Sequence, residues 1–156
     1  MKAVLLALLL PALVLAETPK TVTPEEAQTC QAVGYLQLTI VKRAIFNVYP
    51  GFDPEGTADE QFIAAVAVQS AFTGREWCLN GTMDKYNDMY KKAEAEKESI
   101  CPITQIWFTD LLNEAEGRTL KVKDNLTGPL AFLAVKKEVL ALDKKVCEEG
   151  EKTASL

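Results

Sequence analysis

The chain has 156 residues, of which 17 are basic and 22 are acidic, and its formal net charge is −5. An acidic chain lacks the basic face that phosphate binding needs, so we expect no binding to nucleic acid. The chain contains no histidine, which excludes His-based catalytic triads, imidazole general bases and histidine zinc ligands.

The first 16 residues have the pattern of a secretory signal peptide. Lys2 gives a positive start, an apolar run follows from Ala3 to Val14, and Ala16 ends a small-residue cleavage motif. This run is too short to cross a bilayer as an anchor, and no later segment reaches the length of a membrane span. We therefore predict a signal peptide at 1–16 and a single secreted domain at 17–156, with a polar tail after about residue 148.

The first predicted helix runs from Pro24 to Tyr49. Thr23 and Glu26 are spaced as a capping box, and Pro24 suits the first turn. Apolar residues then recur every three or four positions until Pro50 and Gly51 end the helix. The alternating run 35–40 is also compatible with a strand, but the helical spacing continues on both sides of it.

The second and third predicted helices differ in character. A second capping box, Thr57 with Glu60, starts a helix at Ala58 that continues to about Cys78. It is apolar on nearly every side, which is typical of a central, buried helix. The third helix, near 83–99, carries many charges and only a narrow apolar stripe.

The last two predicted helices are separated by the least helical part of the chain, residues 118–125. The fourth helix opens at Pro102 and is expected to end at Gly117, and the fifth begins at Gly128. The fifth has a regular apolar stripe. This stripe consists of Phe132, Val135, Val139, Leu142 and Val146.

The chain has four cysteines, and an even number in a secreted domain favours disulfides. Cys30 and Cys78 both lie about 30 Å from the loop between their helices, so they match in height. A Cys78–Cys101 pair would have to bridge the helix at 83–99, which is about 25 Å long, whereas disulfide Cα atoms lie about 4–7 Å apart. We therefore predict Cys30–Cys78 and Cys101–Cys147.

The predicted fold is all-α: a bundle of about five helices arranged as two disulfide-stapled antiparallel hairpins joined by a charged helix. With all cysteines oxidised, no thiol nucleophile or thiolate metal site remains. We expect no catalytic residue, metal or cofactor.

Two kinds of candidate site remain. The tripeptides that begin at Asn80 and Asn125 have the N-glycosylation pattern. Aromatic and methionine residues on the second to fifth helices either fill the core, which is the commoner case, or line a ligand pocket. The pocket candidates are Phe62, Tyr86, Met89, Tyr90, Trp107 and Phe132.

The function predicted from these features is non-catalytic binding of an extracellular protein, as an effector, an inhibitor or a receptor ligand. The alternative is an extracellular carrier of a small hydrophobic ligand such as a lipid, a fatty acid or an odorant. A closed apolar cavity would favour the carrier. A filled core with an exposed apolar patch would favour the interaction protein.

Overall fold

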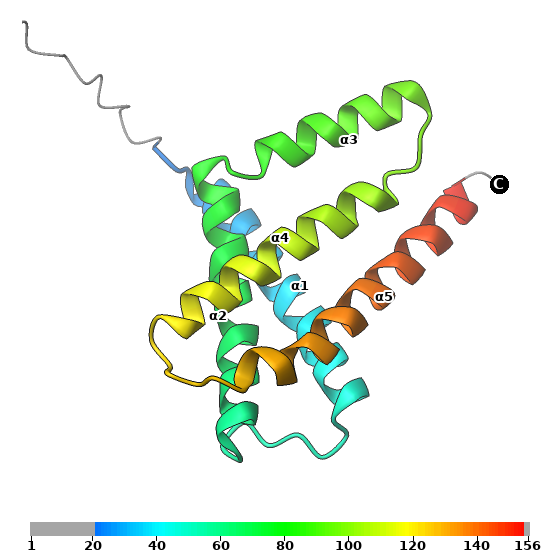
Figure 1. The fold of residues 1–156 in the computed structure, drawn as a ribbon. Helices are drawn as coiled ribbons and strands as arrows, with labels where there is room; N and C mark the ends of the chain where they lie inside the picture. The colour runs from blue at the N-terminus through cyan, green and yellow to red at the C-terminus, as the bar shows by residue number, and fades with distance from the viewer. Residues whose placement is uncertain (1–20, 155–156) are drawn as a thin grey trace, which may run out of the picture.

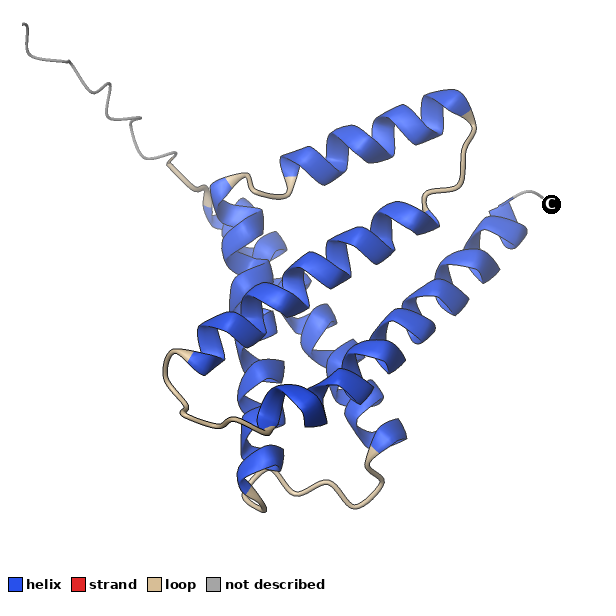
Figure 2. Cartoon of the chain, viewed as in Figure 1, coloured by secondary structure: helices blue, strands red, loops and turns tan. Residues whose placement is uncertain are grey.

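The computed structural model describes residues 21–154 as helices joined by loops, and no strand occurs in this range (Figures 1 and 2). The all-α prediction is confirmed. The signal peptide predicted at 1–16 lies outside the described residues. The helices are α1 (Pro24–Val48), α2 (Ala58–Asn80), α3 (Asp84–Glu96), α4 (Cys101–Leu120) and α5 (Gly128–Ala154).

Both predicted disulfides are confirmed. Cys30–Cys78 joins the start of α1 to the end of α2, with Cα atoms 5.4 Å apart. Cys101–Cys147 joins the first residue of α4 to the late part of α5, with Cα atoms 5.6 Å apart. Each disulfide therefore closes the open end of one antiparallel hairpin, and the charged helix α3 connects the two hairpins, as predicted.

The starts of α1 and α2 follow from their capping boxes. The Thr23 hydroxyl accepts a hydrogen bond from the Glu26 backbone N–H at 3.2 Å, and the Glu26 carboxylate accepts one from the Thr23 N–H at 2.9 Å. Thr57 and Glu60 repeat this reciprocal pair at the same distances. Two otherwise unpaired donors are satisfied at each helix start, which fixes where the chain turns into the helix.

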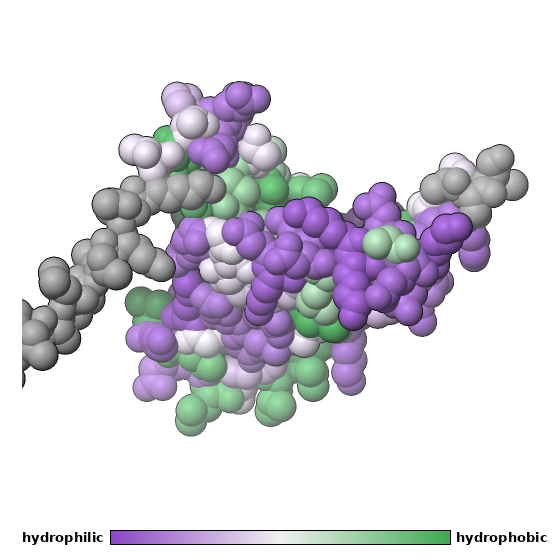
Figure 3. Space-filling model, turned by 90° about the horizontal axis from the view of Figure 1, so that it is seen from above, coloured by the Kyte–Doolittle hydropathy of each residue, from purple (hydrophilic) through white to green (hydrophobic). Residues whose placement is uncertain are grey.

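The two hairpins pack on each other to form one core (Figure 1). Helix α2 contacts α1, α4 and α5, and α5 also contacts α1 and α4. The backbone of α3 lies close to α4 alone among the described helices, and the Tyr86 ring of α3 also stacks on Trp77 of α2. Figure 3 views the molecule from the α3 side and shows hydrophilic residues over most of the nearest surface, as expected for the charged sequence of this helix.

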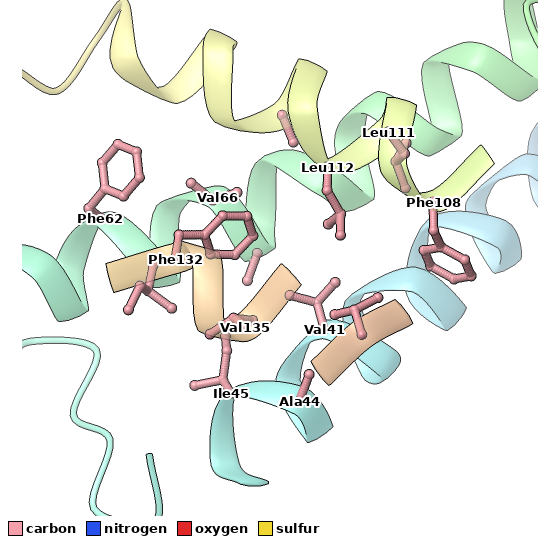
Figure 4. Close-up of a cluster of buried hydrophobic side chains, with 14 of the residues drawn as sticks. Val41, Ala44, Ile45, Phe62, Val66, Phe108, Leu111, Leu112, Phe132 and Val135 are labelled. Atoms are coloured by element: carbon pink, nitrogen blue, oxygen red, sulfur yellow. The ribbon is translucent and has the colours of Figure 1, made fainter. Parts of the chain in front are cut away.

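The core is filled by apolar side chains from all four packed helices (Figure 4). Phe62 and Phe132 are among the largest side chains inside it, and neither has any exposed surface. Gly128 allows the start of α5 to approach Phe62, because a Cβ on Gly128 would lie 2.4 Å from the Phe62 ring. The other fully buried side chains shown in Figure 4 include Val41, Val66, Leu111, Leu112 and Val135.

Two glycines bring α1 and α2 unusually close. A Cβ on Gly34 of α1 would lie 2.7 Å from the Ala71 carbonyl oxygen of α2. A Cβ on Gly74 of α2 would lie 1.7 Å from the Gln37 side-chain oxygen of α1. The notch at Gly74 therefore holds the Gln37 amide, which is 1% exposed and has no hydrogen-bond partner within the described residues.

Helices α3, α4 and α5 end at other residues than the sequence patterns predict. Helix α3 ends at Glu96 because Lys97 takes the left-handed conformation, with φ of 56°. Helix α4 continues through Gly117 to Leu120, since its last turn is held by buried Thr119, whose hydroxyl donates to the Ala115 carbonyl at 2.9 Å. The loop after it contains no strand.

Helix α5 continues past the expected polar tail to Ala154. The Glu151 carboxylate accepts hydrogen bonds from the Ser99 hydroxyl at 2.9 Å and from the Ile100 N–H at 2.8 Å. These bonds and the Cys147 disulfide attach the end of α5 to the start of α4. The apolar stripe of α5 stops earlier, because Val146 is 68% exposed.

Candidate functional site

The structure does not gather the six predicted pocket residues around one hollow. Phe62 and Phe132 lie in the core, and Met89 is 39% exposed. Tyr90 lies beside the hollow between the α3–α4 loop and the end of α5. The two remaining residues make ring contacts: Tyr86 stacks on Trp77, and Trp107 meets Phe108 edge to face.

A polar network at the junction of α2, α3 and α4 surrounds Tyr86. The Tyr86 hydroxyl donates to the Asp110 carboxylate at 2.7 Å, and the Lys85 ammonium lies 4.5 Å from the centre of the Tyr86 ring. On the other side of the stacked pair, the Trp77 indole N–H donates to Glu114 at 3.1 Å, and Glu114 also pairs with Arg118. This network fixes the base of α3 to the rest of the fold.

The electrostatics of this network do not prepare a base or a nucleophile. Burial of the Tyr86 hydroxyl raises its pKa, and the hydrogen bond with Tyr86 raises the pKa of Lys85. Both groups therefore keep their protons at neutral pH. The hydrogen bond from Arg118 lowers the pKa of the Glu76 carboxyl, which stays ionised. We interpret the network as a structural anchor.

The outer side of the first hairpin carries exposed apolar residues from both helices. Val68 and Phe72 on α2 are 47% and 58% exposed, and Tyr35 on α1 is 63% exposed. We call the surface formed by the outward residues of these two helices the α1–α2 face. Along α2 it is a stripe at the three-four spacing of one helix side: Gln61, Ala64, Ala65, Val68, Phe72 and Arg75.

The stripe on α2 lies between two hollows. On the α1 side, a groove of about 230 Å³ has Gly34, Leu38 and Ala71 among its lining residues. On the other side, a shallow hollow of about 550 Å³ has Ala64 and Ala65 among its lining residues. Val68 and Phe72 line both hollows, so they form the ridge between them.

Charges of both signs border the α1–α2 face. Arg75 lines the groove at one end, and Glu55 and Lys123 line the hollow at the other. These three side chains form no ion pair within the described part of the chain. An apolar centre with a charged rim is the common arrangement of a protein interface.

The sequence patterns did not identify this face. Helix α2 is apolar on nearly every side, which led us to expect complete burial, but its neighbours α1, α4 and α5 cover only three sides. The fourth side, with Val68 and Phe72, faces solvent. The three-four spacing of these residues places them on one side of α2. It does not tell whether another helix covers that side.

The two predicted glycosylation sites lie in different surroundings. Asn80 is exposed at the end of α2, and its side-chain oxygen accepts bonds from the N–H and hydroxyl of Thr82. Within the described residues, its amide nitrogen makes no hydrogen bond. The Asn125 amide nitrogen donates to the Ala58 carbonyl at 3.0 Å and to Asp59 at 3.1 Å. Asn125 thus attaches the α4–α5 loop to the start of α2.

When the chain is expressed through a secretory pathway, we expect Asn80, and not Asn125, to be glycosylated. A glycan on Asn125 would replace one of the two amide hydrogens that bind α2. Asn80→Gln should therefore remove the glycosidase-sensitive mass of the protein. Asn125→Gln should leave this mass unchanged and lower the free energy of unfolding by about 1–2 kcal/mol, because the bonds to α2 are lost together with the one that the Asn125 side-chain oxygen accepts from the Gly128 N–H at the start of α5.

Intact-protein mass spectrometry with and without glycosidase measures the first effect, and thermal unfolding measures the second. Thr82→Ala is the matched control, since it removes the glycosylation pattern while Asn80 remains. A glycopeptide that contains Asn125 in the wild-type protein would contradict the assignment.

One group of potential metal ligands occurs within the described residues: Cys101, Cys147 and Glu151. Two of its three ligand atoms are the sulfurs of a disulfide, and the third residue caps the start of α4. This group therefore has a structural explanation.

Comparison of the chain with known protein families, curated proteins and solved structures gives no match. None of the helices described here combines the length and the apolar character that crossing a membrane requires.

Proposed function

We propose that this chain is a secreted, non-catalytic interaction domain that binds a protein on its α1–α2 face. The observation that carries the proposal is the exposure of Tyr35, Val68 and Phe72 on one side of a hairpin that packs against α4 and α5. Exposed aromatic side chains beside small residues give large contact areas with little loss of side-chain entropy.

The disulfides support the extracellular part of the proposal. All four cysteines are paired in two disulfides that close hairpins, and none is free. Such bonds form and persist in oxidising compartments. An extracellular location also agrees with the exposed glycosylation pattern at Asn80.

The packing of the core favours a protein partner over a small hydrophobic ligand. Phe62, Tyr86 and Phe132, which were candidates for a pocket lining, are at most 1% exposed and pack within the core. Gly34 and Gly74 bring α1 and α2 into direct contact. A carrier needs interior volume for its ligand, whereas a face of exposed apolar residues needs another surface to cover it.

Photocrosslinking tests this function. The photoreactive residue p-benzoyl-phenylalanine in place of Phe72 is expected to give a saturable protein adduct in conditioned medium from cells that secrete the chain. Excess wild-type protein should compete for the adduct, and excess Val68→Glu protein should not, because a carboxylate then lies in the apolar centre of the face.

The matched control places the same photoreactive residue at Lys91 on α3, a position with a 78% exposed side chain that lies outside the face. Equal adducts at both positions would refute the proposal. So would adducts at position 72 that contain only lipid.

A further inference from the structure

We propose that the α1–α2 face binds a second copy of this chain, in a twofold dimer whose two α2 helices cross antiparallel at Val68. This inference rests on the proposed function, since it names the protein that the face accepts. In a twofold interface, the same patch on both copies must be complementary to itself. The stripe on α2 meets this requirement in side-chain size and in charge.

The size pattern is complementary about Val68. In an antiparallel crossing at this residue, positions equally far before and after it meet, so Phe72 of each copy lies opposite Ala64 of the other. Phe72 is 58% exposed, and Ala64 lines the hollow of about 550 Å³. Each phenylalanine ring therefore has a hollow lined by small residues to enter, and Ala71 meets Ala65 beside it.

The charge pattern is complementary about the same axis. Arg75 lies about 10 Å along the helix from Val68, at the same distance as Gln61 on the other side of the axis. Glu55 and Lys123 line the same hollow as Gln61. The crossing brings Arg75 of each copy to this hollow of the other copy, where Glu55 is the residue of opposite charge, and neither Arg75 nor Glu55 is otherwise paired within the described residues.

The mixed rim favours a second copy over other partners. A surface that binds an anionic membrane would carry only basic residues at its rim. The rim of this face also carries an acidic residue, since Glu55 lies at one end of the stripe and Arg75 at the other. A partner must present charges of both signs around an apolar centre, and this chain itself does so, with Arg75 at one end and Glu55 and Lys123 at the other. Because the stripe from Gln61 to Arg75 is only about 21 Å long, we expect a weak dimer with micromolar dissociation.

Sedimentation equilibrium of the full secreted chain tests the dimer. The measured mass should rise from one chain to two as the concentration increases through the micromolar range. Val68→Glu should stay monomeric, because two carboxylates would face each other at the axis. Its thermal unfolding should match that of the wild type, since Val68 is 47% exposed.

The matched control is Leu130→Glu, which introduces the same charge at a 74% exposed residue on α5, outside the face. This variant should dimerise like the wild type. Wild-type protein that is monomeric at every concentration would overturn the proposal, and so would a dimer that persists in Val68→Glu.

A charge exchange tests the orientation of the two copies. Arg75→Glu and Glu55→Arg should each raise the dissociation constant about tenfold, and the double variant should restore it. Glu55 lies in the loop before α2 and Arg75 in the second half of α2, about 25 Å away within one chain, so only contact between copies explains the restoration. No restoration would overturn the crossing at Val68.

Covalent trapping tests the position of the axis. Val68→Cys should form a disulfide-linked dimer under mild oxidation, because a residue on the axis meets its own twin. Leu130→Cys should not form one.

The photoreactive residue at position 72 separates this inference from the proposed function. An adduct with the mass of two chains supports both. A competed adduct with a different protein overturns the second copy and leaves the interaction function, whereas adducts with lipid alone overturn both.

Discussion

Removal of the Cys101–Cys147 disulfide by alanine substitution at both positions is expected to lower the free energy of unfolding by about 4 kcal/mol. The cysteines are 46 residues apart in the sequence, so the reduced unfolded chain gains much conformational freedom. A second effect is local. The end of α5 packs little against the core, because Val146 is 68% exposed. Without the disulfide, the Glu151 carboxylate attaches it to the start of α4, and the nearest attachment before it is the Asp143 carboxylate, which accepts hydrogen bonds from Thr104 and Gln105.

Denaturant unfolding measures the loss of stability, and amide hydrogen exchange measures the local effect. The amides of residues 144–154 should exchange by local opening, faster than global unfolding would expose them, while the amides of α1 should exchange only through global unfolding. Val146→Ala is the control, and as an exposed substitution it should change stability by less than about 0.5 kcal/mol. Equal exchange along α1 and α5 in the disulfide variant would contradict local fraying.

The disulfides could be predicted because helix length converts sequence separation into distance. Cys30 and Cys78 lie at matched heights only in an antiparallel pair, and the observed pairing agrees. Helix starts were equally accessible from the sequence, since Thr23 and Thr57 cap through contacts within four residues. Both arguments depend on local geometry, which needs no knowledge of the tertiary fold.

The helix ends and the α1–α2 face could not be predicted from the sequence in the same way. Gly117 lies inside α4, because packing of Thr119 outweighs the weak helix propensity of one glycine. Val68 and Phe72 are exposed because α2 has three helical neighbours and not four. The number and placement of neighbours are tertiary properties, and helical spacing assigns a residue to a side of a helix without saying what covers that side.

The pocket hypothesis illustrates the same limit. Phe62, Met89 and Phe132 have similar apolar character, but the structure places the two phenylalanines in the core and leaves Met89 partly exposed on α3. Helix α3 contacts α4 and, through Tyr86, Trp77 of α2, so the side of α3 that carries Met89 is left partly open. Composition alone does not separate these environments.

Gly74→Ala is expected to destabilise the protein by about 1–3 kcal/mol, although alanine is the better helix former. The new Cβ would lie 1.7 Å from the Gln37 side-chain oxygen, and Gln37 is 1% exposed, so its amide has no open space to enter. The helices α1 and α2 must then separate. Gly117→Ala is the matched control: nothing lies within 4 Å of its new Cβ, and it should stabilise the protein by about 0.5–1 kcal/mol.

A second substitution identifies the cause of this destabilisation. Gln37→Ala removes the colliding atoms and also the buried amide without a hydrogen-bond partner. In the Gly74→Ala background it should therefore restore stability, and the coupling energy between the two positions should reach about 1–3 kcal/mol by denaturant unfolding. If the two losses simply add, the Gln37 amide does not occupy the notch at Gly74, and the close approach of α1 and α2 must depend on Gly34 and Ala71 alone.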